Sequence, residues 1–424
     1  MISSQAIELK RNQRLKPIEL ERLQNKKLRA IIKHSYENVP LYHNLLKEAN
    51  LKPDNIKTTR DLSKIPILTK SMLRNLPLEH LVAKNIDSTA LWKHYTSGTS
   101  GLPLSVYWER NATIDQYLRN YRFQLKCGDK IRNKQVDIGA GWACHSPCAH
   151  AGQRMGLFKT LIIPPLGFTD MQTIIKKIKE FGADTLIAPP SIVRLLGKEI
   201  AETDVKGLRI RLVFTGGEML DDYTRKISQE VFGAKLFDGY GTNELGFISG
   251  ECEKHIGYHI ESDACIVEIT RDGESVSPGE EGEITVTSLT HYATPLIRYN
   301  LEDIGKLTKS ECSCGSFFSL MKITQGRKSD VLKLPNCRVV PAVTIYQPLS
   351  PIIGIKQFQL QQEKIDRFAV KIVKDQNFTE KTAEAVKSTL LSKVGEAQVE
   401  IYFVDEIPRK TRKFKPFVTQ VPVN

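Results

Sequence analysis

The chain has 424 residues, of which 41% are hydrophobic and 26% are charged. This composition is typical of a globular protein, and the length allows a large core and more than one domain. We expect a cytoplasmic protein without a membrane span, because no apolar run is long enough to cross a bilayer and the first residues do not resemble a signal peptide. The net charge of +13 is spread along the chain, and basic residues are not interleaved with aromatic ones, which argues against nucleic-acid binding.

The sequence predicts a polar and mainly helical region over residues 1–90. Between Glu19 and Ala49 apolar residues such as Leu28 and Ile31 recur at helical spacing, which predicts helices. The Val39-Pro40 pair interrupts this pattern, since the residue before a proline disfavours the helical conformation. We interpret the region as packing structure.

A loop rich in hydroxyl side chains and glycine spans residues 96–103, between strands predicted at 92–95 and 104–107. Glycine allows unusual backbone angles and close approach of main-chain N–H groups, while serine and threonine add hydroxyl donors. An ordinary solvated turn has a similar composition, and no Gly-Lys-Ser/Thr sequence follows, so this is not a Walker loop. The phosphate-binding candidates are Thr96, Ser97, Gly98, Thr99, Ser100 and Gly101.

Strands and helices alternate between about residues 131 and 246. Strands are predicted at 161–163, 185–188, 211–214 and 236–237, and helices from Asp170, from Pro189 and over 220–231. Such alternation favours a mostly parallel sheet with helices on both faces, in which ligands bind beyond the carboxyl ends of the strands. Two glycine-containing turns are expected there, at 215–218 and 238–241.

The pattern changes twice in the C-terminal half. Short strands at 264–269 and 283–288 predict a β-rich subdomain over about 247–325. Residues beyond Arg327 predict a compact β-β-α-β arrangement. We therefore expect two domains, a large one over 1–327 and a small one over 328–424.

Four stretches, by their order and spacing, resemble the adenylate-forming superfamily of acyl-CoA synthetases, luciferases and peptide-synthetase adenylation domains. Their details, with the N-terminal helices, look more like the branch that contains phenylacetate–CoA ligase, a capsular-polysaccharide K protein and a deazaflavin-adenylating synthetase. The resemblance implies an α/β adenylate-forming fold with parallel sheets in the large domain and a small, mobile α+β C-terminal domain. The stretches are Thr96–Pro103, Asp238–Glu244, Arg298–Asp303 and Gly326–Asp330 with the residues up to Pro341.

The resemblance implies ATP-dependent, AMP-forming activation of a carboxylic acid, an aryl acid being the better fit, to an acyl-adenylate. Transfer to coenzyme A would follow. Alternatives are an adenylate-forming enzyme with an amine, a hydroxyl or no acceptor, and a nucleotide-sensing protein without catalysis. The acyl substrate stays open, as does the choice between monomer and homodimer.

The resemblance also implies a role for each motif. The Thr96–Gly101 loop would hold the β- and γ-phosphates of ATP, and Asp303 would hold the ribose. Glu244 would bind Mg²⁺, with Thr242 beside it as a further catalytic candidate. Lys413 would bridge the substrate carboxylate and the α-phosphate as a compact cation. The nucleotide-binding candidates outside the loop are Gly216, Gly217, Glu218, Asp238, Gly239, Tyr240, Gly241, Thr242, Asp303 and Arg327.

Three positions depart from the pattern of the family. Leu104 stands where many relatives carry a lysine, which leaves hydroxyls and main-chain amides to grip the phosphates. Arg412 replaces the glycine before the catalytic lysine, so Lys410 and Lys415 remain alternatives to Lys413. Ser329 occupies the hinge, where relatives often have an acidic residue, and Arg298 is open between a site role and a structural ion pair.

Eight cysteines without a secretion signal favour free thiols or a metal site over disulfides. In the branch named above, the spacing of Cys252, His259, Cys312 and Cys314 implies a structural zinc site, with His255 as a rival ligand. A second group could bind a metal or border the substrate pocket; it comprises Cys144, His145, Cys148 and His150. The remaining cysteines are expected to be small buried apolar residues; they are Cys127, Cys265 and Cys337.

Overall fold

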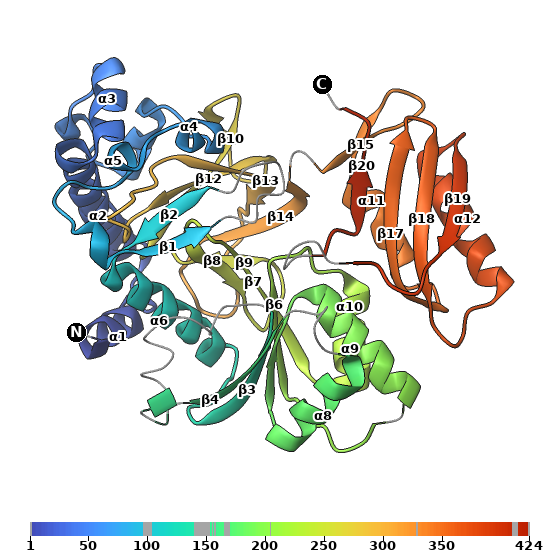
Figure 1. The fold of residues 1–424 in the computed structure, drawn as a ribbon. Helices are drawn as coiled ribbons and strands as arrows, with labels where there is room; N and C mark the ends of the chain where they lie inside the picture. Colours follow the sequence, from blue (N-terminus) through green and yellow to red (C-terminus); the bar gives the residue numbers. More distant parts are fainter. Residues whose placement is uncertain are drawn as a thin grey trace. The chain divides into compact units, whose positions relative to one another are not determined.

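The structure is a computed structural model that describes residues 2–95, 104–139, 153–154, 156, 158–164, 170–203, 205–327, 330–408 and 414–422. The chain divides into two compact units, each with elements from distant parts of the sequence (Figure 1). The first unit consists mainly of residues 1–131 and 237–324, and the second mainly of residues 158–236 and 325–424.

The N-terminal region of the first unit is helical, as predicted. Val39 is extended (φ −114°, ψ 111°) because Pro40 follows it, and this residue separates the second helix from the third. Leu28, Ile31 and Ile32 are fully buried in the core of the unit. The helices are α1 (Ile2–Asn12), α2 (Pro17–Asn38), α3 (Pro40–Glu48), α4 (Lys70–Arg74), α5 (Leu78–Leu81) and α6 (Arg110–Lys126), with 3₁₀ turns at Pro53–Asn55, Thr59–Lys64 and Ser88–Ala90.

The strands of the first unit form a hairpin and a larger sheet. Strands β1 (Trp92–Tyr95) and β2 (Ser105–Trp108) lie on either side of the hydroxyl-rich loop, as predicted, and the structure shows that they pair antiparallel. The larger sheet has the order β11-β10-β12-β13-β14-β9-β8-β7. Its strands are β7 (Lys235–Thr242), β8 (Gly246–Glu251), β9 (Tyr258–Ile260), β10 (Cys265–Arg271), β11 (Glu274–Ser275), β12 (Gly282–Ser288), β13 (Tyr299–Leu307) and β14 (Leu320–Arg327).

Arg298, just before β13, is a structural residue in the first unit. Its side chain is 2% exposed, and its Nη1 donates to the carbonyl oxygen of Ile65 at 2.6 Å. The guanidinium also pairs with Glu268 at 3.2 Å and donates to the carbonyl of Gly273 at 3.2 Å. Arg298 therefore ties the segment before α4 to strand β10, which decides between the two roles that the sequence left open.

We expect the substitution Arg298→Met to lower the free energy of unfolding by about 3–5 kcal/mol, because it leaves the half-buried Glu268 carboxylate without its cation and removes the donor to the buried carbonyl oxygen of Ile65. Chemical unfolding followed by circular dichroism measures this loss. Arg271→Met is the matched control, since Arg271 is exposed and donates to the carbonyl of Glu281 at the surface. An equal effect of the two substitutions would contradict the structural role of Arg298.

The second unit contains a parallel α/β layer, as the alternation predicted. The strand order is β6-β5-β3-β4, and all neighbouring pairs are parallel. Helix α9 packs against both α8 and α10, and Figure 1 shows the three helices beside the strands. The elements are β3 (Asn133–Ile138), β4 (Phe158–Ile163), α8 (Met171–Phe181), β5 (Thr185–Ile187), α9 (Pro190–Thr203), β6 (Leu212–Gly216) and α10 (Asp222–Phe232).

The C-terminal part of the second unit has a hydrophobic core of its own, built around Leu360, Phe368 and Leu390. The predicted β-β-α-β order is confirmed, and a last strand adds to the sheet parallel to β17, giving the order β19-β18-β17-β20. The elements are β15 (Val331–Lys333), β16 (Val339–Pro341), α11 (Ala342–Tyr346), a 3₁₀ turn (Gln347–Leu349), β17 (Ile355–Lys364), β18 (Arg367–Lys374), α12 (Glu380–Val394), β19 (Gln398–Phe403) and β20 (Phe417–Thr419).

The positions of three cysteines and the lengths of the helices test two further predictions. The prediction that Cys337 is buried is wrong: it is exposed, with a φ of 64°, in the turn between β15 and β16. Cys127 and Cys265 are buried, as expected. Among the helices that the structure describes, none has both the length and the apolar character needed to cross a bilayer.

Candidate nucleotide and metal sites

The glycine-rich segment 238–242 lies within strand β7 and not in a turn, which corrects the sequence prediction. Glycine serves here for close strand pairing, because a Cβ atom on Gly241 would lie 2.3 Å from the carbonyl oxygen of Gly246 in β8. A register shift between Tyr240 and Gly241 follows the same close approach. The strand therefore continues to Thr242, whose hydroxyl accepts the N–H of Leu245 at 3.2 Å and closes the next turn.

Glu244 lies in that turn, and its side chain is 9% exposed. Its Oε1 is 3.6 Å from Nζ of Lys70, the first residue of α4, and accepts the hydroxyl of Tyr299 at 3.3 Å. Burial and the neighbouring carboxylate raise the pKa of Tyr299 far above its usual value, so the phenol keeps its proton. The carboxylate is a suitable Mg²⁺ ligand. Sequence reasoning missed Lys70, since a lysine in the first turn of a short helix gives no local functional signal.

Two nucleotide candidates of the first unit contact each other. The hydroxyl of Tyr240 in β7 donates to Oδ2 of Asp303 in β13 at 2.6 Å, and both side chains are half-buried. Asp238 is 4% exposed and accepts the hydroxyl of Tyr258 at 2.8 Å. Asp303 thus lies at an accessible position where a carboxylate can meet a pair of hydroxyls, whereas Asp238 contributes to the packing of the sheet.

The other candidates lie in the second unit. Gly216 ends strand β6, and Gly217 follows with a φ of 81°, a conformation that suits glycine. Both carboxylate oxygens of Glu218 accept main-chain N–H groups. Arg327 ends β14, and its carbonyl oxygen accepts the N–H of Asp330 at 2.9 Å. Burial raises the pKa of Asp330, and the positive charges of Arg327 and Lys415 oppose that shift.

Several predicted site residues lie outside the residues that the structure describes. They are the Thr96–Gly101 loop, Ser329, Lys410, Arg412, Lys413, Cys144, His145, Cys148 and His150. Leu104, at the end of the loop, is described: its side chain is 3% exposed and belongs to the core of the first unit. An apolar side chain at this position is therefore explained by packing.

Four of the predicted metal ligands come together between β8, β9 and the segment before β14. One ligand atom from each residue lies within 4.8 Å of the others; the residues are Cys252, His259, Cys312 and Cys314. The Sγ atoms of Cys252 and Cys312 are 3.5 Å apart, and Sγ of Cys314 is 3.2 Å from Nε2 of His259.

A second contact fixes the orientation of the histidine ring. Nδ1 of His259 donates to the carbonyl oxygen of Phe318 at 3.0 Å, so that Nε2 is left as an acceptor toward the thiols. The rival ligand His255 lies elsewhere: its Nδ1 is 3.3 Å from Oε2 of Glu251 and its ring stacks on Phe237. The geometry favours His259 as the fourth ligand.

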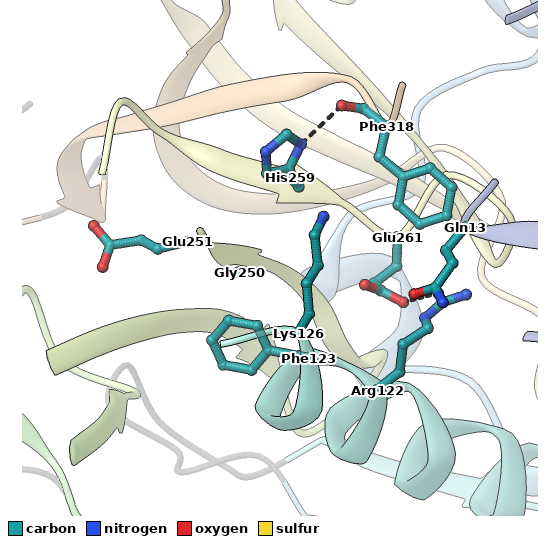
Figure 2. A pocket seen from close by; sticks show the side chains of 9 residues that line it. All are labelled: Gln13, Arg122, Phe123, Lys126, Gly250, Glu251, His259, Glu261 and Phe318. Atoms are coloured by element: carbon teal, nitrogen blue, oxygen red, sulfur yellow. Dashed lines mark hydrogen bonds and ion pairs between the residues drawn. The ribbon is translucent and has the colours of Figure 1, made fainter. Parts of the chain in front are cut away.

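A small pocket borders this cluster (Figure 2). It offers about 20 Å³, enough for a water molecule or two and too little for a nucleotide or an organic acid. Arg122 pairs with Glu261 on its floor, and the ring of His259 turns toward the carbonyl of Phe318. The pocket is thus part of the packing between α6 and the sheet.

Comparison with known proteins covers nearly the whole chain. Residues 13–291 match the AMP-binding enzyme family, and residues 334–417 match the CapK C-terminal domain. The chain is 28% identical to a phenylacetate-coenzyme A ligase of Escherichia coli (strain K12), over 85% of each chain. It is 30% identical to a phenylacetate-coenzyme A ligase of Pseudomonas putida, over 81% of this chain and 78% of that protein.

Solved structures show the same fold at lower sequence identity. A 2-hydroxyisobutyryl-CoA ligase in its postadenylation state, in complex with 2-HIB-AMP, aligns with a TM-score of 0.82 at 16% identity, over 97% of this chain and 91% of that chain. An o-succinylbenzoate CoA synthetase of Bacillus subtilis, in complex with its acyl-adenylate intermediate, aligns with a TM-score of 0.52 at 15% identity, over 75% of this chain and 66% of that chain. The chain belongs to the AMP-binding enzyme family, in the branch that contains the phenylacetate–CoA ligases, and it carries a CapK C-terminal domain.

Proposed function

We propose that this chain is an ATP-dependent, AMP-forming acid–CoA ligase. It activates a carboxylic acid to an acyl-adenylate with release of pyrophosphate, and then transfers the acyl group to the thiol of coenzyme A. The observation that carries the proposal is the identity of 28–30% to phenylacetate–CoA ligases over more than four-fifths of the chain. An aryl acid is the substrate class that these relatives support.

In the proposed reaction a carboxylate oxygen of the acid attacks the α-phosphorus of ATP, and pyrophosphate leaves. Asp303 holds the ribose hydroxyls, and Tyr240, which donates to Asp303 at 2.6 Å, flanks the adenine and orients that carboxylate. Lys413 bridges the attacking carboxylate and the α-phosphate. The Thr96–Gly101 loop and Arg327 contact the phosphates and the nucleotide.

Glu244 is the proposed ligand of Mg²⁺, which would neutralise charge on the phosphate oxygens when bound. The residues fit this role, because the contacts of the buried carboxylate with Lys70 and Tyr299 both go to Oε1. Neither contact occupies Oε2. Thr242 holds the turn that carries Glu244. Lys70 also places a positive charge beside Glu244. This charge would partly replace the lysine that is missing at the end of the phosphate loop.

We infer two functional domains, residues 1–327 for nucleotide and acid binding and residues 328–424 for the lysine segment. We propose that the enzyme is cytoplasmic, because the reaction consumes ATP and coenzyme A. Light scattering decides between a monomer and a homodimer. A second candidate function rests on the CapK C-terminal domain match: transfer of the acyl group to a hydroxyl or amine of a cell-surface precursor.

Pyrophosphate release from ATP tests the function directly. We expect release with at least one member of a panel of aryl and aliphatic acids, with a CoA thioester as the product when coenzyme A is present. The Lys413→Ala variant serves as the inactive control, with a loss of about 10²-fold or more, because the compact cation is removed from the reacting phosphate. No release with any acid would refute the ligase. Release without thioester formation would favour the second candidate.

We propose that the four-residue cluster in the β-rich subdomain binds structural zinc. The residues fit this metal, since two thiolates on tetrahedral zinc are about 3.8 Å apart and the sulfur atoms of Cys252 and Cys312 are already 3.5 Å apart. Cys312, Cys314 and Cys252 would supply thiolates and His259 its Nε2. A closed four-ligand site stabilises the fold and performs no chemistry.

A further inference from the structure

Glu218 lies in the loop between β6 and α10, and it joins two distant parts of the second unit. Its Oε2 accepts the N–H of Ser191 at 3.1 Å, and its Oε1 accepts the N–H of Phe414 at 2.9 Å. Ser191 is in the first turn of α9, where main-chain N–H groups have no partner within the helix and a negative charge is favourable. Both carboxylate oxygens are therefore engaged by main-chain donors.

Helix α9 makes further polar contacts with the C-terminal part of the unit. Arg194 donates to the hydroxyl of Ser350 at 2.7 Å, and its other nitrogen pairs with Asp221 at 2.9 Å, just after Glu218 in the same loop. One helical turn later Lys198 donates to the carbonyl oxygen of Ile355.

The next residue of α9, Glu199, extends this contact surface. It is 8% exposed and pairs with Lys356 at 2.9 Å. Burial on this surface lowers the pKa of Lys198 to about 8, because desolvation disfavours the charged ammonium group. The contact of Glu218 with Phe414 thus belongs to a continuous polar surface along α9.

We propose that Glu218 is a positioning residue for adenylate formation: by holding the amide of Phe414, it sets the place of Lys413, which directly precedes Phe414 in the chain. The inference rests on the proposed function, in which Lys413 acts on the α-phosphate. The sequence placed Glu218 among the nucleotide ligands. In the structure its two oxygens accept main-chain N–H groups.

The physical reason is the strength and direction of the bond. A carboxylate that accepts an N–H forms a charge-assisted hydrogen bond, which is shorter and stronger than a neutral one. Consecutive Cα atoms are joined by a rigid peptide unit, so an anchor on the N–H of one residue restricts where the side chain of the preceding residue begins. A misplacement of about 1 Å in a reacting group can cost about 10²-fold in rate. The carboxylate of Glu218, on the loop after β6, can therefore control the position of Lys413.

Amide hydrogen exchange tests the anchor without reference to activity. In the Glu218→Ala variant we expect the amide of Phe414 to exchange at least about tenfold faster than in the wild type. Glu230→Ala is the matched control, since Glu230 lies on α10 of the same unit, with a side chain that is 60% exposed. Glu218→Asp, one methylene shorter and unable to reach both donors, gives a second variant if Glu218→Ala does not fold. Unchanged exchange at Phe414 would overturn the anchor.

Kinetics test the positioning role. We expect Glu218→Ala to lower kcat for ATP–pyrophosphate exchange at least about tenfold, with KM for ATP changed less than about twofold, because Lys413 is misplaced and the nucleotide contacts remain. In a Lys413→Ala background the same substitution should cost less than about twofold, since two residues that act as one unit are not additive.

Two kinetic results would overturn the proposal. A rise in KM for ATP at constant kcat would make Glu218 a nucleotide ligand, as the sequence predicted. A full additional loss in the Lys413→Ala background would show that Glu218 acts independently of the lysine. If the wild-type chain exchanges pyrophosphate with no acid, the proposed function fails, and hydrogen exchange alone then decides whether Glu218 holds Phe414.

Discussion

Replacement of Glu244 by glutamine is expected to lower kcat/KM for ATP in pyrophosphate exchange by about 10²–10³-fold, the usual loss for removal of one preorganised charge partner of a reacting phosphate or oxyanion. The substitution keeps the shape of the side chain and its contact with Tyr299, but it removes the charge that faces Lys70 and the proposed Mg²⁺. Exchange rates measured over a range of Mg²⁺ concentrations should show that more Mg²⁺ is needed for half-maximal activity.

The control for Glu244→Gln is Glu79→Gln, in which an exposed carboxylate on α5 of the same unit loses its charge. This control should retain wild-type rates. A Glu244→Gln enzyme with an unchanged Mg²⁺ requirement would contradict the assignment. A comparable loss in Glu79→Gln would point to a general effect of net charge.

The Cys312→Ser substitution is expected to remove the bound zinc, which we predict at about one equivalent per chain in the purified protein. Three ligands then remain of the four that lie within 4.8 Å of one another. Loss of a structural metal is among the few single changes that cost more than about 4 kcal/mol of unfolding free energy. Metal analysis by mass spectrometry measures the first effect, and chemical unfolding with and without a chelator measures the second.

Cys337→Ser is the matched control for the zinc site, because it makes the same exchange of atoms at an exposed turn. It should keep the full metal content and the wild-type stability. If Cys312→Ser also keeps its metal, the ligand set is wrong. If the wild type contains no zinc and a chelator leaves its stability unchanged, the four residues are free thiols and a packed histidine.

Local sequence signals predicted most of the fold. Pro40 ended one helix and began the next, and the alternation of apolar strands with amphipathic helices gave the parallel layer of β3 to β6. The same logic failed at 238–242, where glycines indicated a turn. Only the partner strand shows why glycine is needed there: Gly241 lies against the main chain of β8, a contact that no local pattern encodes.

The sequence motifs predicted which residues belong to the candidate site. They did not predict the contacts between residues that lie far apart in the sequence. The pairing of Tyr240 with Asp303 joins two motifs that the resemblance had placed side by side in function. Lys70 beside Glu244 and the bond from Phe414 to Glu218 join residues from different parts of the sequence. Such contacts arise from tertiary packing, which leaves no trace in spacing or composition.

Leu104 has a consequence for which side chains this position can hold. Its side chain is 3% exposed and packs in the hydrophobic core of the first unit, at the position where the family resemblance leads one to expect a lysine. A lysine at this position would place an ammonium group among apolar side chains, at a large desolvation cost. The packing of the first unit therefore keeps this end of the phosphate loop apolar.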